Sequence, residues 1–135
     1  MVTTLEDPEI EMPPGDFGDR MKIVREKAVK SVALARSRGI KLAAGSDSGG
    51  NPYGRHGKFY VQLEGLVQCG LSPLEAIRAA TTAAAELMGL SDEIGTITPG
   101  KSADLLVIDG DPLKDIRSFR RLDMVVAGGR VFRLG

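Results

Sequence analysis

The sequence has 135 residues, of which 42% are hydrophobic and 27% are charged, and its 18 basic residues balance its 18 acidic ones. A chain of this length can bury about two thirds of its unfolded surface, which is enough for one ordinary soluble domain. The zero net charge gives no long-range attraction to nucleic acid or to anionic lipid. No apolar run approaches the roughly 20 residues that a membrane helix needs. We therefore expect neither a nucleic-acid partner nor a membrane partner.

The cysteine and histidine counts limit the chemistry that the chain can carry. Cys69 is the single cysteine and His56 the single histidine. An internal disulfide and a cysteine zinc cluster are therefore excluded, and a three-histidine metal site is hard to build from this chain alone. The first residues lack a basic segment followed by an apolar one, so no signal peptide is visible. The compartment is not specified, and we take the cytoplasm as the default.

The first third of the chain predicts an extended arm and then a helix. Residues 1–19 contain six acids and no base, with a Pro-Pro-Gly run, and they open with a strand-like stretch at residues 2–5. Residues 20–41 are strongly basic and predict an amphipathic helix that ends at Gly39. Its apolar positions recur at helical spacing: Met21, Val24, Ala28, Val32 and Ala35. This helix is either a solvated outer helix beside the acidic arm or a basic surface for a partner.

A short apolar strand and a polar loop follow this helix. Residues 40–45 predict a buried strand, and residues 46–57 form a loop rich in glycine and polar side chains. A helix, a tight glycine, a buried strand and a polar loop are typical of a parallel α/β unit. The carboxyl ends of such strands are where α/β folds place their functional groups.

The rest of the chain changes from helical to strand-like periodicity. Residues 59–69 predict one helix, and residues 72–89 predict another that begins with a capping box of Ser72 and Glu75 around a proline. A Pro-Gly turn precedes an apolar strand at residues 103–109. Two further strands at residues 124–127 and 130–133 flank the Gly-Gly signal of a two-residue hairpin.

Three features of the polar loop are candidates for chemistry. Asp47 directly follows the buried strand, where a carboxylate can be a metal ligand or a general base, or can simply cap a turn. His56 can contact a substrate or carry a proton, although a lone loop histidine is more often just exposed. The glycines at residues 49–57 match neither standard phosphate-binding spacing, so an anion cradle has little support.

Three motifs resemble the metal-dependent amidohydrolase superfamily, and the resemblance as a whole extends over nearly the whole chain. Residues 95–109 resemble its G-T-I-x-P-G-K-x-A-D-L-x-V-x-D signature, and residues 71–81 resemble its penultimate helix. Residues 45–47 (Gly-Ser-Asp) resemble the G-[ST]-D at the end of barrel strand eight. The His56-Gly57 pair resembles the branch that contains imidazolonepropionase-like enzymes and Xaa-Pro or Xaa-Arg dipeptidases.

The resemblance implies a (β/α)8 barrel with one or two divalent metal ions, usually zinc, and a small β-sandwich built from both chain ends. It implies that Asp47 binds metal and moves a proton from the attacking water to the leaving amine. This chemistry is reasonable because a metal ion lowers the pKa of its bound water. A carboxylate that touches both the metal and that water can then carry the proton. From their loop position, Tyr53, Arg55 and His56 are expected to line the substrate mouth.

The family's His-x-His on strand one, its bridging lysine or carboxylate on strand four and its histidines on strands five and six have no counterpart in this chain. A complete barrel needs about 250 residues. The expected fold is therefore α/β: residues 1–90 as the last two βα units of the barrel and residues 91–135 as part of the sandwich. We expect the C-terminal segment of an enzyme that hydrolyses amide or cyclic amide bonds of a small molecule or dipeptide. Alone, the chain is expected to be inactive, with an N-terminal barrel fragment or further copies of itself as partners.

A second hypothesis comes from a different functional class. The chain would be a non-catalytic remnant that serves as an interaction or structural module, with the basic helix and the acidic arm as its working surfaces. The coding sequence upstream of Met1 separates the two hypotheses. An adjacent frame that encodes the missing histidines favours the enzyme, and its absence favours the remnant.

Overall fold

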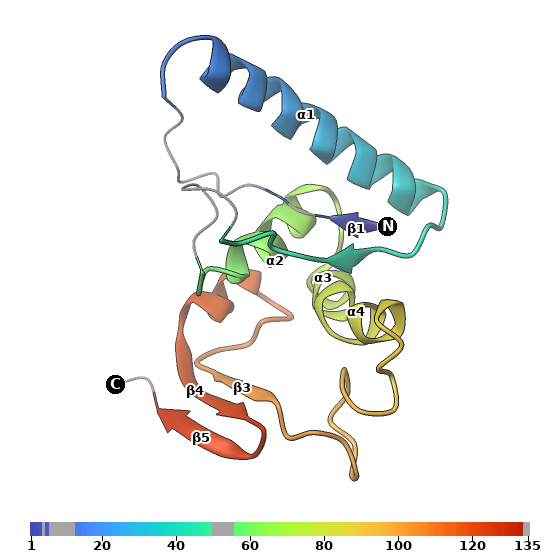
Figure 1. Cartoon of the computed structure of the whole chain (residues 1–135), viewed down its shortest axis with the longest axis vertical. Helices are drawn as coiled ribbons and strands as arrows, with labels where there is room; N and C mark the ends of the chain where they lie inside the picture. Colours follow the sequence, from blue (N-terminus) through green and yellow to red (C-terminus); the bar gives the residue numbers. More distant parts are fainter. Residues whose placement is uncertain (4, 6–12, 50–55, 134–135) are drawn as a thin grey trace.

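The computed structural model describes residues 1–3, 5, 13–49 and 56–133 (Figure 1). The architecture is α/β, as predicted, with one parallel pair of strands, one antiparallel sheet and a group of helices. In chain order the elements are β1 (Val2–Thr3), α1 (Asp16–Ser37), β2 (Ala43–Ala44), α2 (Tyr60–Gln68), α3 (Pro73–Ala80), α4 (Thr82–Leu87), β3 (Leu105–Ile108), the 3-10 helix η1 (Ile116–Arg120), β4 (Leu122–Ala127) and β5 (Arg130–Arg133). None of the helices in the described ranges is long and apolar enough to cross a lipid bilayer.

β1 and β2 form the parallel pair that the sequence predicted, although β2 covers only Ala43–Ala44 of the strand predicted over residues 40–45. The Ala43 N–H donates to the Met1 carbonyl over 2.9 Å, and the Gly45 N–H donates to the Thr3 carbonyl over the same distance. In Figure 1, α1 passes on one side of this pair and the helices α3 and α4 lie on the other. Because the two strands run in the same direction, their carboxyl ends lie at one edge.

α1 is longer at its start than the sequence predicted. It begins at Asp16 instead of Arg20, so the last acidic residues of the predicted arm belong to the helix. Asp16 and Asp19 lie in its first turn, where negative charge is favourable to the helix dipole. Val32 and Ala35 face the core as predicted, whereas Val24 is exposed. Gly39 has the predicted left-handed conformation, with a φ of 68°.

The single helix predicted over residues 72–89 is in fact two helices. The capping box at its start is confirmed, because the Ser72 hydroxyl accepts from the Glu75 N–H and the Glu75 carboxylate accepts from the Ser72 N–H. The helix breaks at Thr81, whose φ of −124° and ψ of −88° are not helical. Here the backbone of Gly95 approaches so closely that a Cβ on it would lie 2.7 Å from the Cβ of Ala85. The break lies where the following segment packs on the helix pair.

The C-terminal segment forms an antiparallel sheet in the order β3–β4–β5. The predicted hairpin is confirmed: Ala127 pairs with Arg130 across Gly128 and Gly129, whose φ values of 54° and 78° suit a type I′ turn. The sequence did not predict η1, the 3-10 helix between β3 and β4. Its first residue, Ile116, is buried in the main core.

The core lies between the parallel pair and the helices, with one contribution from η1. Its buried residues are Leu5, Val32, Ala35, Leu42, Leu63, Leu66, Cys69, Leu71, Ala76, Ala79 and Ile116. By contrast, every residue of β3, β4 and β5 is half-buried or exposed. The fold therefore fixes the carboxyl edge of β1 and β2 against a packed helical layer and leaves the three-stranded sheet uncovered by this chain's described residues.

Candidate functional site

The candidate site begins at the carboxyl edge of the parallel pair. The last strand bond, from the Gly45 N–H to the Thr3 carbonyl, lies two residues before Asp47. The buried Thr3 hydroxyl also donates to the Ala43 carbonyl over 3.3 Å. These bonds hold the start of the polar loop to the end of β1, as a parallel α/β unit requires.

Asp47 stands just beyond this edge in an uncommon backbone conformation. Its φ is 49°, the one positive value at a non-glycine residue in the described part of the chain. Aspartate tolerates this left-handed region better than most residues. The Ser48 N–H donates to the Ser46 hydroxyl over 3.4 Å, so the chain turns on either side of Asp47. The turn leaves Asp47 exposed, where its carboxylate is open to a substrate or a water molecule.

His56 lies against the same loop. A Cβ on Gly49 would stand 2.7 Å from the His56 Nε2, so the ring packs directly on that glycine. This contact places the imidazole over a residue only two positions after Asp47. The other two predicted site residues, Tyr53 and Arg55, lie outside the described residues.

The described side chains near Asp47 do not by themselves form a metal site. Within residues 1–3, 5, 13–49 and 56–133, no group of three or more His, Cys, Asp and Glu side chains is placed to hold one. Asp47 contributes a single carboxylate, and a divalent ion needs several ligands. Burial raises the pKa of the Cys69 thiol, which favours the neutral form that binds metal poorly. A metal held at this edge would need ligands beyond those described.

Sequence reasoning missed Gln62, whose side chain holds the chain just after β1. The Leu5 N–H donates to the Gln62 Oε1 over 2.6 Å, and the Gln62 Nε2 donates back to the Leu5 carbonyl. The side-chain amide thus pairs with a main-chain residue as a neighbouring strand would. The burial of Gln62 is known only from the structure, so the sequence carried no signal for this contact.

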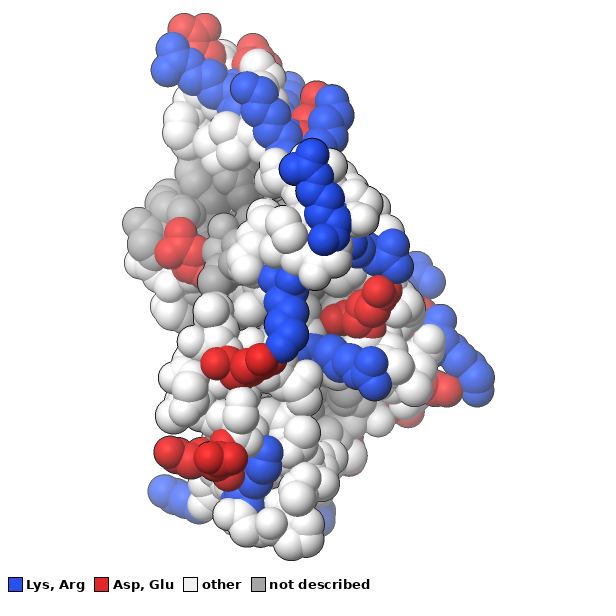
Figure 2. Space-filling model, turned by 90° about the vertical axis from the view of Figure 1, so that its right-hand side faces the viewer, with Lys and Arg blue, Asp and Glu red and all other residues white. Residues whose placement is uncertain are grey.

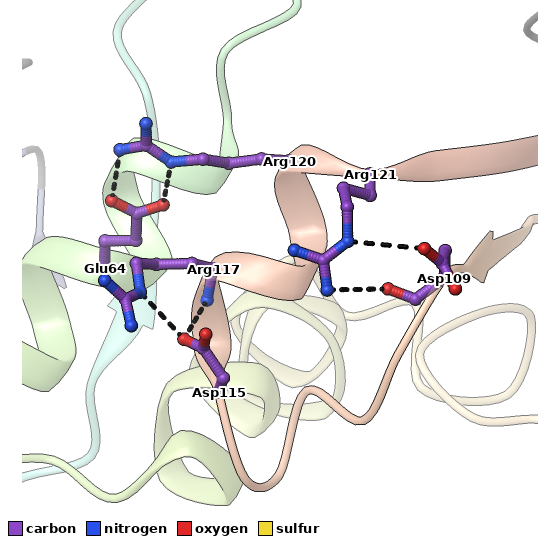
Figure 3. A network of polar contacts seen from close by, with 6 residues as sticks. All are labelled: Glu64, Asp109, Asp115, Arg117, Arg120 and Arg121. Atoms are coloured by element: carbon purple, nitrogen blue, oxygen red, sulfur yellow. Dashed lines mark hydrogen bonds and ion pairs between the residues drawn. The ribbon is translucent and has the colours of Figure 1, made fainter.

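Sequence reasoning also missed the ion pair of Glu64 and Arg120, which joins α2 to η1 (Figure 3). The Arg120 Nε and Nη2 donate to the two carboxylate oxygens over 2.6 and 2.7 Å, a bidentate arrangement. Glu64 has a side chain only 10% exposed. The guanidinium also lies over the Tyr60 ring, 5.2 Å from its centroid. This contact fixes the C-terminal segment to the helix that leads away from the polar loop.

Two basic residues, one in the last turn of α1 and one just after it, form ion pairs with the helices α3 and α4. Arg36 contacts Glu75 of α3 at 3.1 Å, and Lys41, which follows α1, contacts Glu86 of α4 at 2.5 Å. Figure 2 shows basic side chains along the part of this face where α1 lies, with acidic side chains among them. The mixed charge on this face gives no broad positive surface.

The comparisons with known proteins agree with the resemblance read from the sequence. Residues 19–132 match the amidohydrolase family. The chain is 36% identical to an imidazolonepropionase of Sphingopyxis alaskensis over 90 residues, which cover 66% of this chain and 22% of that protein. It is similar to a putative prolidase from Bifidobacterium longum, with 33% identity and a TM-score of 0.80 over 88% of this chain and 30% of that one. It is also similar to an Xaa-Pro dipeptidase with bound methionine in the active site, with 28% identity and a TM-score of 0.78 over 87% and 28% of the two chains.

The chain thus spans less than a third of each of these three relatives. The likeness to imidazolonepropionase and to prolidase structures confirms the branch that His56-Gly57 suggested. It also agrees with the (β/α)8-type fold expected for the family.

Proposed function

Because the chain belongs to the amidohydrolase family, we propose that it is the C-terminal segment of a metal-dependent hydrolase that cleaves an amide or cyclic amide bond. The substrate would be a small molecule or a dipeptide, as the names of the imidazolonepropionase and Xaa-Pro dipeptidase relatives suggest. The observation that carries this proposal is the position of Asp47. It follows the Gly-Ser pair at the carboxyl end of β2, the edge at which α/β enzymes carry out their chemistry.

In this proposal Asp47 is the proton carrier of the reaction and one ligand of the metal, which we take to be zinc. An exposed carboxylate at the strand edge can accept a proton from an attacking water and return it to the leaving nitrogen. His56 packs on the loop beside Asp47, so we assign it to the substrate mouth together with Tyr53 and Arg55. When bound, the metal would make a bound water acidic, and the further ligands it needs would come from the rest of the barrel.

The partner of this chain would be the N-terminal part of the barrel. β1 and β2 are two residues long and pair only with each other among the described residues, although parallel sheets are normally buried and extended on both sides. α1 exposes Ile23 and Val24. A flanking barrel segment would cover the strand edges and apolar side chains of residues 1–90, and residues 91–135 would join the sandwich. Alternatively, further copies of this chain would cover these strand edges and apolar side chains. Without a partner of either kind we expect no catalysis.

A chimera tests the role of Asp47 directly. The part of the Bifidobacterium longum prolidase-like protein that this chain matches would be replaced by residues 1–135, and hydrolysis of an Xaa-Pro dipeptide panel would be measured. We expect Asp47→Asn to lower kcat roughly 10²- to 10⁴-fold, the usual contribution of a positioned acid-base group. Asp123→Asn, at an exposed position of β4, is the matched control and should leave kcat unchanged.

Two results would contradict the proposal. If the active chimera keeps its kcat after Asp47→Asn, Asp47 carries neither of the roles assigned to it. If the 135-residue chain alone hydrolyses the dipeptides, the requirement for the rest of the barrel is wrong.

A further inference from the structure

We propose that Gln62 is a positioning residue that sets the carboxyl edge of β1 and, through it, the start of the loop that carries Asp47. The functional meaning of this inference rests on the proposed function, but the contact itself does not. Its basis is the pairing of one buried side chain of α2 with both main-chain groups of Leu5.

The contact between Gln62 and Leu5 has the geometry that recognises a main-chain residue. A glutamine amide has one acceptor and one donor side by side, which matches the N–H and the carbonyl of one extended residue. Gln62 is buried and so is Leu5, so neither main-chain group of Leu5 can easily exchange its partner for water. One turn along the helix, a Cβ on Gly65 would stand 2.7 Å from the Leu5 Cδ1. α2 therefore lies directly against Leu5.

The position of Leu5 is passed to Asp47 through β1. Leu5 is two residues after Thr3, whose carbonyl accepts from the Gly45 N–H over 2.9 Å. Gly45 is in turn two residues before Asp47. A clamp on Leu5 therefore restrains Thr3, and Thr3 restrains the residue at which the polar loop starts. β1 is only two residues long, so the contact at Leu5 adds to the few hydrogen bonds that hold β1 against β2.

Amide hydrogen exchange of the full 135-residue chain tests the clamp without any need for activity. Gln62→Met keeps the shape of the side chain but removes both hydrogen bonds. We expect the protection factors of the Leu5 and Gly45 amides to fall together, roughly tenfold or more. Gln68→Met, at an exposed glutamine of the same helix, is the matched control and should change neither amide.

Gln62→Glu adds a pH-dependent measurement, which should show no change if Gln62 only fills space. A protonated carboxyl group has an acceptor and a donor and reproduces both bonds, whereas a carboxylate cannot donate to the Leu5 carbonyl. Burial raises the pKa of a carboxyl group, so the two forms can be compared at about pH 5 and about pH 8. We expect near wild-type protection at Gly45 at the lower pH and a loss at the higher pH, with no such change in Gln68→Glu.

The outcomes separate clearly. The inference is overturned if Gly45 keeps its protection when Leu5 loses it, or if Gln62→Glu protects Gly45 equally at both pH values. Should Gln62→Met fail to fold, the pH dependence of Gln62→Glu decides alone. If the exchange pattern is as expected but the chimera has no hydrolytic activity, the proposed function is wrong and the inference about Gln62 still holds.

Discussion

The α/β region, from β1 to α4, and the sheet region, from β3 to β5, differ sharply in how they bury their apolar side chains. The first packs residues from three of its four helices, together with Leu5 and Leu42 next to the two strands, into one core. The second has four strongly apolar residues in β3, yet none of them is buried, and Phe132 on β5 is exposed. The apolar side chains of the two regions are therefore unequally covered in the same chain.

The difference shows how the sheet region is held in place. Its strands rely on the ladder of main-chain bonds and on the two-residue hairpin, while η1 between them supplies the anchor. Ile116 enters the core of the α/β region, and Arg120 pairs with Glu64 of α2. An antiparallel sheet with apolar side chains on an open face is well suited to pack on a second sheet. This agrees with our proposal that residues 91–135 form part of a sandwich.

Core truncation in the two regions should give the largest contrast. Leu66 of α2 is fully buried, and Leu66→Ala should lower the free energy of unfolding by about 2–5 kcal/mol, since it leaves a cavity in a packed core. Val131 of β5 is 58% exposed, and Val131→Ala should change the free energy of unfolding by no more than about 0.5 kcal/mol. Urea denaturation followed by circular dichroism measures both. Equal losses in the two variants would show that the sheet region has a cover in solution.

Breaking the anchor should have an intermediate effect. Arg120→Ala leaves the Glu64 carboxylate buried without its bidentate partner, so we expect a loss of about 1–3 kcal/mol. Arg120→Lys keeps the charge but not the planar fork, and should recover only part of the loss. Arg117→Ala is the matched control, because Arg117 of the same η1 forms an exposed pair with Asp115 and should contribute little.

This prediction is tested by amide hydrogen exchange, which reports on the two regions separately. Amide exchange should show loss of protection in β3–β5 before α2–α4 in Arg120→Ala. An Arg117→Ala variant as unstable as Arg120→Ala would mean that the Glu64 pair is not the anchor.

Local patterns predicted most of the elements, whereas the contacts that hold them together were not predictable. The capping box at Ser72, the turn at Gly128-Gly129 and the strand that leads to Asp47 depend on neighbouring residues, and each is confirmed. Gln62 and Glu64 have partners that are 57 and 56 residues away in the chain, and no spacing within a helix reveals such partners. The helix break at Thr81 was missed for the same reason, because Gly95 packs there from another segment.

The candidate site was predictable only in its location. The apolar strand before Asp47 placed the carboxylate at a sheet edge, and the structure bears this out. Its left-handed backbone was not foreseen, since no glycine marks that position. The contact of His56 with Gly49 joins residues seven positions apart, and single-residue propensities do not specify such a contact.

Acid titration should give the smallest contrast between the two regions. Hydrogen bonds from the Ser72 backbone, with further help from Arg36, lower the pKa of Glu75 from 4.5 to about 2. A carboxyl group with a depressed pKa in the folded state contributes stability that is complete above its unfolded pKa. That stability should therefore decline as the pH falls from 4.5 towards 2. Because the Glu75 side chain is 43% exposed, solvent screens its pair with Arg36, and we expect Glu75→Gln to cost only about 1 kcal/mol near neutral pH.

The sheet region offers a matched carboxylate for this titration. The Gly128 N–H donates to Asp104 over 2.7 Å, and this bond lowers the pKa of Asp104. Asp104→Asn keeps an acceptor for the Gly128 N–H but cannot titrate, so it should remove the acid dependence of the hairpin and leave that of α3 intact. The ¹³C shifts of the two carboxyl carbons, followed against pH, measure each site. A Glu75 that titrates at its ordinary pKa would show that the capping box and the Arg36 contact do not persist in solution, and that α3 is held to α1 by the apolar core alone.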